Sequence, residues 1–138
     1  MSDQQNQSDV SPIDYASALE RIGGDEDFLN ELLELYTTEF SKYFEKLQDA
    51  IHKGNCQSIK DIGHTLKGSS ANLSLIRLKE ISYQMECAGQ DKDINKAKDA
   101  LLILGKEFQI LKDYIDSRFH GKREDSRIQG FKGSSEKN

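Results

Sequence analysis

His64 stands among residues that suit group transfer. At helical spacing, Lys60 lies one turn before it and Lys67 one turn after it. An ordinary imidazole is mostly neutral at pH 7, and neutral imidazole is a nucleophile. A lysine beside the ring can pair with a phosphoryl group as a point charge. These residue types at this spacing predict phosphoryl transfer, with His64 as the acceptor and Lys67 as the supporting cation.

Gly68, four residues after His64, leaves the same surface bare. A glycine inside a helix costs about 1 kcal/mol relative to alanine, so an exposed one indicates that something approaches the backbone closely. Gly63 would add a similar cost. Lys60 and Ala71 border the bare surface and are candidate contacts for a docked partner. A convex helix face forms no enclosed pocket, so transfer between two proteins fits better than turnover of a small molecule.

The helix that would carry His64 spans about residues 56–73. Ile62, Leu66 and Leu73 share one side of it, and His64 points about 180° away from them. The pattern therefore places His64 on the solvent face, near the middle of the helix. Ser69 and Ser70 are expected to bond back to helix carbonyls or to face the core.

Helical periodicity extends over residues 13–119, and no stretch alternates with a period of two. The single proline agrees with long helices. Five helices are predicted, a short first one and four longer ones, over about 11–22, 25–54, 56–73, 75–88 and 93–119. Their short connections favour an all-α fold, an antiparallel four-helix bundle with an additional N-terminal helix.

Local signals predict where these helices begin and end. Ser11-Pro12 would cap the first helix, Asp25 the second, and Asp91 or Asp93 the last. Gly54 and Gly89 would close the second and fourth helices.

The first helix is expected to cross the end of the bundle. It would leave Ile13 or Leu19 partly exposed, as candidate contacts for a partner. Residues 1–12 and 120–138 are polar and are expected to be flexible ends around the 13–119 bundle.

The composition narrows the class of protein. The chain has 138 residues, which favours one domain, and 24 acidic against 19 basic residues give a net charge of −5. An acidic chain is a poor general nucleic-acid binder. No apolar run reaches the roughly 18 residues that a membrane span needs, and the polar N-terminus is unlike a secretory signal. We therefore expect a cytoplasmic protein without membrane contact.

Metal binding and disulfides are not expected. Cys56 and Cys87 are too few for a disulfide framework or a zinc quartet, and both are expected to be free and inert. His52 and His120 are too far from His64 along the chain to form a metal pair by helical spacing. Both are expected near helix ends.

The ten residues from His64 to Leu73, HTLKGSSANL, resemble the signature of histidine-containing phosphotransfer (Hpt) domains. The helical pattern over 13–119 is similar to that family as well. The resemblance implies an antiparallel four-helix bundle that serves as an intermediate in two-component phosphorelays. It implies that His64 is phosphorylated at a ring nitrogen, that Lys67 stabilises the phosphate and that Gly68 clears the docking surface.

The same resemblance implies the partners. Hpt domains accept a phosphoryl group from an aspartyl phosphate on a receiver domain and pass it to another receiver, in response regulators and hybrid histidine kinases. The receiver supplies the acidic pocket and Mg²⁺, so no cofactor of the chain's own is expected. Nothing resembles an ATP-binding kinase domain, which implies a phosphocarrier without kinase activity. We expect a monomer and a small separate protein.

The sequence departs from the family pattern at two places. Ser74 follows the motif where members usually have glycine, which bears on the turn between the third and fourth helices. Many members also place a glutamine near the histidine from the next helix, and here the candidates are Gln84 and Glu86. A glutamate would orient the imidazole but repel a phosphoryl group.

Two other functions stay open at this point. One is a helical adaptor that docks a signalling partner without transferring phosphate. The other is an enzyme with its own hydrolase or kinase activity, which the absence of a pocket motif or nucleotide loop disfavours.

Overall fold

The computed structural model describes residues 11–120 of the chain. The expected flexible ends fall largely on residues 1–10 and 121–138, which lie outside the described residues, as do the side chains of Phe119 and His120. All regular elements of the described part are helical: α2 (Tyr15–Arg21), α3 (Glu26–Lys53), α4 (Cys56–Asn72), α5 (Ile76–Gln90), α6 (Ile94–Ile115) and the π-helical turn η1 (Asp116–His120). The predicted all-α fold with a short N-terminal helix is confirmed.

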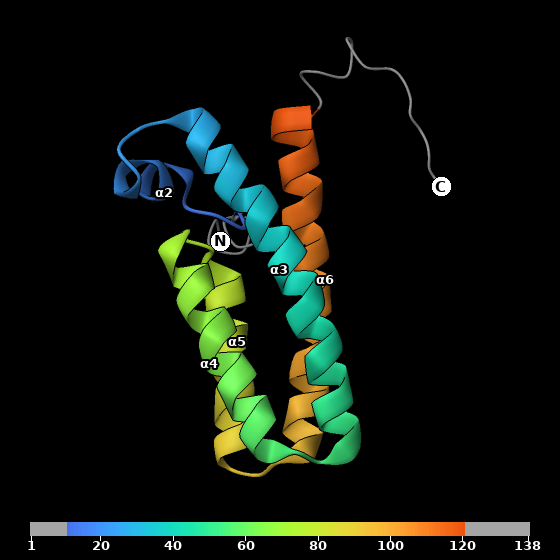
Figure 1. The fold of residues 1–138 in the computed structure, drawn as a ribbon. Coiled ribbons are helices and arrows are strands. Elements are labelled where there is room, and N and C mark those ends of the chain that lie inside the picture. The colour runs from blue at the N-terminus through green and yellow to red at the C-terminus, as the bar shows by residue number, and fades with distance from the viewer. Residues whose placement is uncertain (1–10, 121–138) are drawn as a thin grey trace, which may run out of the picture.

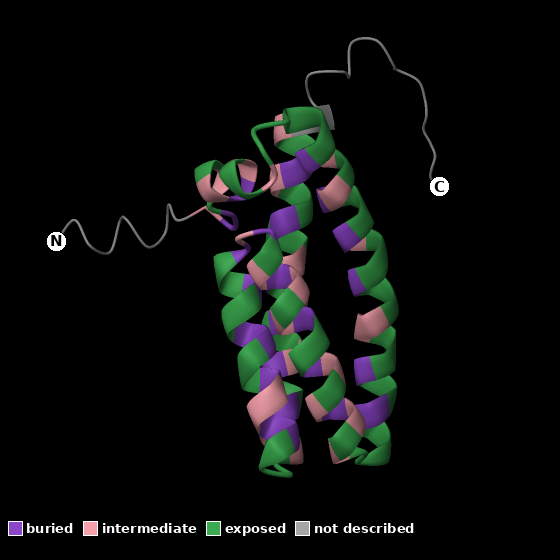
Figure 2. Cartoon of the chain, turned by 60° about the vertical axis from the view of Figure 1, so that its left-hand side comes forward, coloured by how far each residue is buried: buried purple, intermediate pink, exposed green. Residues whose placement is uncertain are grey.

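The four long helices lie side by side and alternate in direction, while α2 lies at one end of the bundle (Figure 1). Exposed residues occupy the outward sides of the long helices, and buried residues face inward (Figure 2). The predicted apolar stripes are therefore the faces that the helices bury against one another.

Side-chain caps explain where the long helices begin. Carboxylate oxygens of Asp25 and Asp93 accept from backbone N–H groups three residues on, at 3.1 and 3.0 Å. Asn55 caps α4 in the same way. Gly54 ends α3 in the left-handed conformation, with φ of 70°. The predicted caps at Asp25, Asp93 and Gly54 are confirmed.

The predicted start of α2 is wrong. Its N-cap is Asp14, whose carboxylate accepts from the Ser17 N–H at 3.1 Å, and Ser11-Pro12 lies before the helix. The Asp14 N–H itself donates to the Ser74 carbonyl at 2.9 Å, which ties the chain to the α4–α5 turn. Pro12 and Ile13 are buried, so the segment that precedes α2 packs against the bundle before the helix begins.

The predicted role of Gly89 is also wrong. α5 continues through Gly89 to Gln90, and Gly89 is buried inside the helix. The left-handed position of the following turn belongs to Lys92, with φ of 58°. Gly89 is needed for a close approach to α4, because an added Cβ would overlap the backbone of Lys60.

Ser74 takes a conformation that glycine adopts more easily. Its φ is 57°, in the turn between α4 and α5. Its hydroxyl donates to the Ser17 hydroxyl at 3.1 Å, so the same residue holds α2 through its side chain and its carbonyl. Serine in place of the family's usual glycine thus still forms the turn, and its hydroxyl adds a contact to α2.

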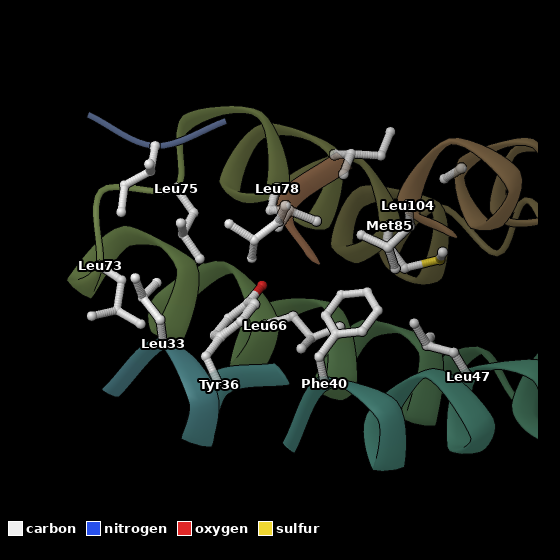
Figure 3. Packing of buried hydrophobic residues seen from close by; sticks show 14 of the residues in the cluster. Leu33, Tyr36, Phe40, Leu47, Leu66, Leu73, Leu75, Leu78, Met85 and Leu104 are labelled. Carbon is white, nitrogen blue, oxygen red and sulfur yellow. The ribbon is translucent and has the colours of Figure 1, made fainter. Parts of the chain in front are cut away.

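The core is built from large side chains of all the long helices (Figure 3). The Phe40 ring stacks on Phe108, with centroids 3.9 Å apart. The Tyr36 hydroxyl lies 2.8 Å from the Ser70 hydroxyl, and burial raises the pKa of Tyr36. Ser70 faces the core and Ser69 bonds back to the Thr65 carbonyl, as predicted.

Candidate functional site

The structure places His64 on the solvent face of α4, as predicted. Its side chain is 68% exposed, whereas Leu66 on the same helix is buried in the core. The caps and the apolar stripe of α4 fix this orientation, because turning the helix would expose Leu66 and Ile59.

Glu86 on α5 joins the two predicted site residues. Its Oε2 lies 3.1 Å from His64 Nδ1, and its Oε1 lies 2.8 Å from Lys67 Nζ. The Glu86 side chain is only 18% exposed. Gln84, the other candidate for this contact, is exposed along a hollow between α5 and α6 with Arg77. Glu86 therefore supports the histidine, and Gln84 does not.

Lys67 and His64 keep the Glu86 carboxylate ionised. The hydrogen bond from Lys67, followed by that from His64, holds the pKa of Glu86 below its ordinary value, against the opposing effect of desolvation. Glu86 is thus an ionised carboxylate at neutral pH. Lys67 is 28% exposed, and its ammonium lies 5.1 Å from the centre of the Tyr83 ring.

The contact with Glu86 determines which ring nitrogen of a neutral His64 carries the proton. An ionised carboxylate only accepts hydrogen bonds, so the proton of a neutral His64 ring is assigned to Nδ1. Nε2 then carries the lone pair. With a neutral ring, the site therefore combines an exposed His64 side chain whose Nε2 holds the lone pair, a lysine one turn away and a carboxylate at Nδ1.

The two glycines near His64 differ. Gly68 is exposed, and an added Cβ would meet no atom within 4 Å, which agrees with the bare surface predicted for it. Gly63 is buried, and an added Cβ would lie 2.6 Å from the Glu86 amide nitrogen. A glycine is therefore needed at position 63 because α4 packs there directly against the backbone of α5.

The predicted docking residues differ in exposure. Of Ile13 and Leu19, one of which was expected to stay partly exposed, Leu19 is half-buried and meets that expectation. Ile13 is 2% exposed and belongs to the buried segment that precedes α2, so as a docking candidate it is wrong. Lys60 is half-buried, with its backbone against Gly89. Ala71 is half-buried in a hollow that also includes Lys67 and Gly68.

A second hollow lies on the other side of α4. It measures about 620 Å³ and is lined by α2, α3 and α4, including Leu32, Leu35 and Tyr43 with Thr65 and Ser69 of α4. Leu35 is one of the large exposed apolar side chains. An apolar groove thus adjoins the helix face that carries His64.

The other described histidine and cysteine side chains are those of His52, Cys56 and Cys87. Among residues 11–120, no group of His, Cys, Asp and Glu side chains could hold a metal ion. Cys56 and Cys87 are free thiols. His52 is exposed in the last turn of α3, as predicted. No helix in the described range is long and apolar enough to cross a membrane.

Sequence reasoning missed Tyr83. It lies outside the apolar stripe of α5 and is half-exposed, three residues before Glu86. An aromatic residue at that position on an otherwise polar helix face was the available signal.

The model of the Hpt domain family matches residues 31–116. Since this is more than half of the chain, the protein belongs to the Hpt domain family. It is an Hpt phosphorelay protein, a phosphocarrier rather than a kinase. The predicted family resemblance is confirmed.

Individual relatives agree with this assignment. The chain is similar to the phosphorelay protein LuxU of Vibrio vulnificus strains YJ016 and CMCP6, with 26% identity in each case over 107 residues, which cover 77% of this chain and 91% of the relative. It also resembles the crystal structure of histidine-containing phosphotransfer protein B (HptB) from Pseudomonas aeruginosa PAO1, with a TM-score of 0.72. That match covers 84% of this chain and 97% of the other at 19% identity, and it shows the shared fold.

Proposed function

We propose that this protein accepts a phosphoryl group on His64 from a receiver-domain aspartyl phosphate and passes it to the aspartate of another receiver domain. The observation that carries the proposal is the Glu86–His64 contact on an exposed helix face, because in a neutral ring it assigns the proton to Nδ1 and the lone pair to Nε2. Lys67 and Gly68, two further residues of the motif, supply charge and clearance beside it.

The transfer needs no proton movement at the ring. The Nε2 lone pair attacks phosphorus, the N–P bond forms, and the P–O bond to the donor aspartate breaks with its electrons leaving on the carboxylate. Nδ1 keeps its proton throughout, so the phosphorylated ring is positively charged and is stabilised by the Glu86 carboxylate. A protonated ring is also the better leaving group when the next aspartate attacks.

The arrangement also reduces the repulsion expected between the Glu86 carboxylate and a phosphoryl group on the ring. Glu86 contacts Nδ1, and the phosphoryl group would be attached on the other ring nitrogen, so the ring separates the two anions. Lys67 shares its positive charge between the Glu86 carboxylate and the incoming oxygens.

A receiver domain fits the surroundings of His64. Gly68 leaves room for its approach, and the apolar groove beside α4 offers surface that a partner can bury. In this proposal the receiver brings Mg²⁺, and this chain acts as a monomer in the cytoplasm without a cofactor of its own.

Phosphorylated receiver domain, mixed with wild-type protein or with His64→Gln, tests the proposal. Label should move to the wild type and to the matched control His52→Gln, and not to His64→Gln. Equal labelling of wild type and His64→Gln would exclude His64 as the acceptor. A stable complex between the receiver domain and this protein, with no label transferred to wild type or to His64→Gln, would favour the adaptor function instead.

A further inference from the structure

Two glycines bring the backbones of α4 and α5 together. A Cβ at Gly63 would lie 2.6 Å from the Glu86 nitrogen and 2.9 Å from the Glu86 Cα. A Cβ at Gly89 would overlap the Lys60 nitrogen and lie 2.7 Å from the Lys60 Cα. Non-bonded carbon atoms prefer separations of about 3.5–4.0 Å. Any side chain at either position would therefore push the two helices apart.

Both contacts belong to one antiparallel register. Gly63 of α4 lies opposite Glu86 of α5, and Gly89 of α5 lies opposite Lys60 of α4, one turn further along. α4 packs more extensively against α5 than against any other helix. The two glycines thus fix a single spacing from both sides of the interface.

This spacing determines whether Glu86 reaches His64. Gly63 directly precedes His64, and the backbone that it contacts is that of Glu86 itself. The Glu86–His64 distance of 3.1 Å is near the long end of the N–H···O range, so a displacement of a few tenths of an ångström weakens this hydrogen bond. Both partners of the Glu86 carboxylate, His64 at 3.1 Å and Lys67 at 2.8 Å, belong to α4, so separating α5 from α4 stretches both contacts at once.

We propose that Gly63 and Gly89 are positioning residues for His64. By holding α4 and α5 at backbone contact, they keep Glu86 on Nδ1 and the lone pair on Nε2. The consequence for transfer rests on the proposed function, whereas the effect on the ring does not.

The ring tautomer of His64 gives a direct test, by NMR of protein labelled with ¹⁵N-histidine at a pH where the ring is neutral. Wild type should carry the proton on Nδ1. Gly63→Ala and Gly89→Ala should shift it toward Nε2, and Glu86→Ala, which removes the contact itself, should do the same. The matched control is Gly105→Ala on α6, where the new Cβ would meet only the Phe44 ring edge at 3.4 Å and the tautomer should stay unchanged.

A folded Gly63→Ala or Gly89→Ala variant that keeps the wild-type tautomer would overturn the proposal. Should either variant unfold, it is repeated in the Gly105→Ala background, which adds helix propensity. Helical circular dichroism establishes that each variant is folded.

Transfer from a phosphorylated receiver then separates the two proposals. Gly63→Ala should slow it roughly ten- to hundredfold, and should slow it no further when Glu86→Ala is already present, because both act through one contact. A shifted tautomer with an unchanged transfer rate would uphold the positioning role and contradict the proposed chemistry of Nε2. Additive losses in the double variant would contradict the positioning role.

Discussion

The α3–α6 and α4–α5 interfaces hold the bundle together in different ways. Between α3 and α6, Phe40 stacks on Phe108, and large rings fill the space. Between α4 and α5, backbone meets backbone at Gly63 and Gly89. Rings supply buried area, whereas a glycine contact fixes a distance. The candidate site residues His64, Lys67 and Glu86 lie on the interface where the distance is fixed.

Phe40→Ala gives the largest expected effect on the aromatic interface. Phe40 is 1% exposed, so its truncation should lower the free energy of unfolding by roughly 3–5 kcal/mol, as measured by urea denaturation. The His64 tautomer should not change in the folded variant. A shifted tautomer would mean that the two interfaces are not independent.

Two variants of Ser74 separate the backbone strain in the α4–α5 turn from the hydrogen bond to Ser17. Ser74→Ala keeps a side chain at φ of 57° and loses the bond to Ser17, whereas Ser74→Gly loses the bond but relieves the strain. Ser74→Gly should therefore be more stable than Ser74→Ala by about 1 kcal/mol. Equal midpoints in urea would show that the turn carries no such strain.

Acid should remove the stabilisation that comes from Glu86. Lys67 and then His64 hold the pKa of this carboxyl below its ordinary 4.5, so its contribution is complete above that value and is lost as pH falls through the lower folded pKa. The stability difference between wild type and Glu86→Gln should be level near neutrality and shrink below about pH 4.5. A difference that grows on acidification would contradict the lowered pKa.

Lys67→Ala should have the smallest effect on folding. Surface changes usually stay within about 0.5 kcal/mol, and this ion pair is partly exposed. The variant should still transfer phosphate more slowly or hold it for a shorter time, which a labelled time course measures. Unchanged transfer and lifetime would remove Lys67 from the site.

The sequence predicted what local rules determine. The apolar period gave the helices and turned His64 outward, and Asp25, Asp93 and Gly54 marked helix ends because capping depends on neighbouring residues. The ten-residue motif identified the family and the face of α4 on which the candidate site lies.

What the sequence could not supply depends on contacts between helices. A glycine that ends a helix and one that admits a neighbouring backbone look alike in sequence, so Gly89 was misread. The choice between Gln84 and Glu86 required the rotation of α5 against α4. Which of Ile13 and Leu19 stays partly exposed also depends on such contacts, because nothing local shows that the chain packs Ile13 inward before α2.

In the proposed transfer, His64 reacts through Nε2 while Glu86 holds the proton on Nδ1. ³¹P–¹⁵N NMR of ¹⁵N-histidine-labelled protein, after exposure to a phosphorylated receiver domain, shows which ring nitrogen carries the phosphorus. Phosphorus should couple to Nε2 of His64. Coupling to Nδ1, or to another histidine, would contradict it.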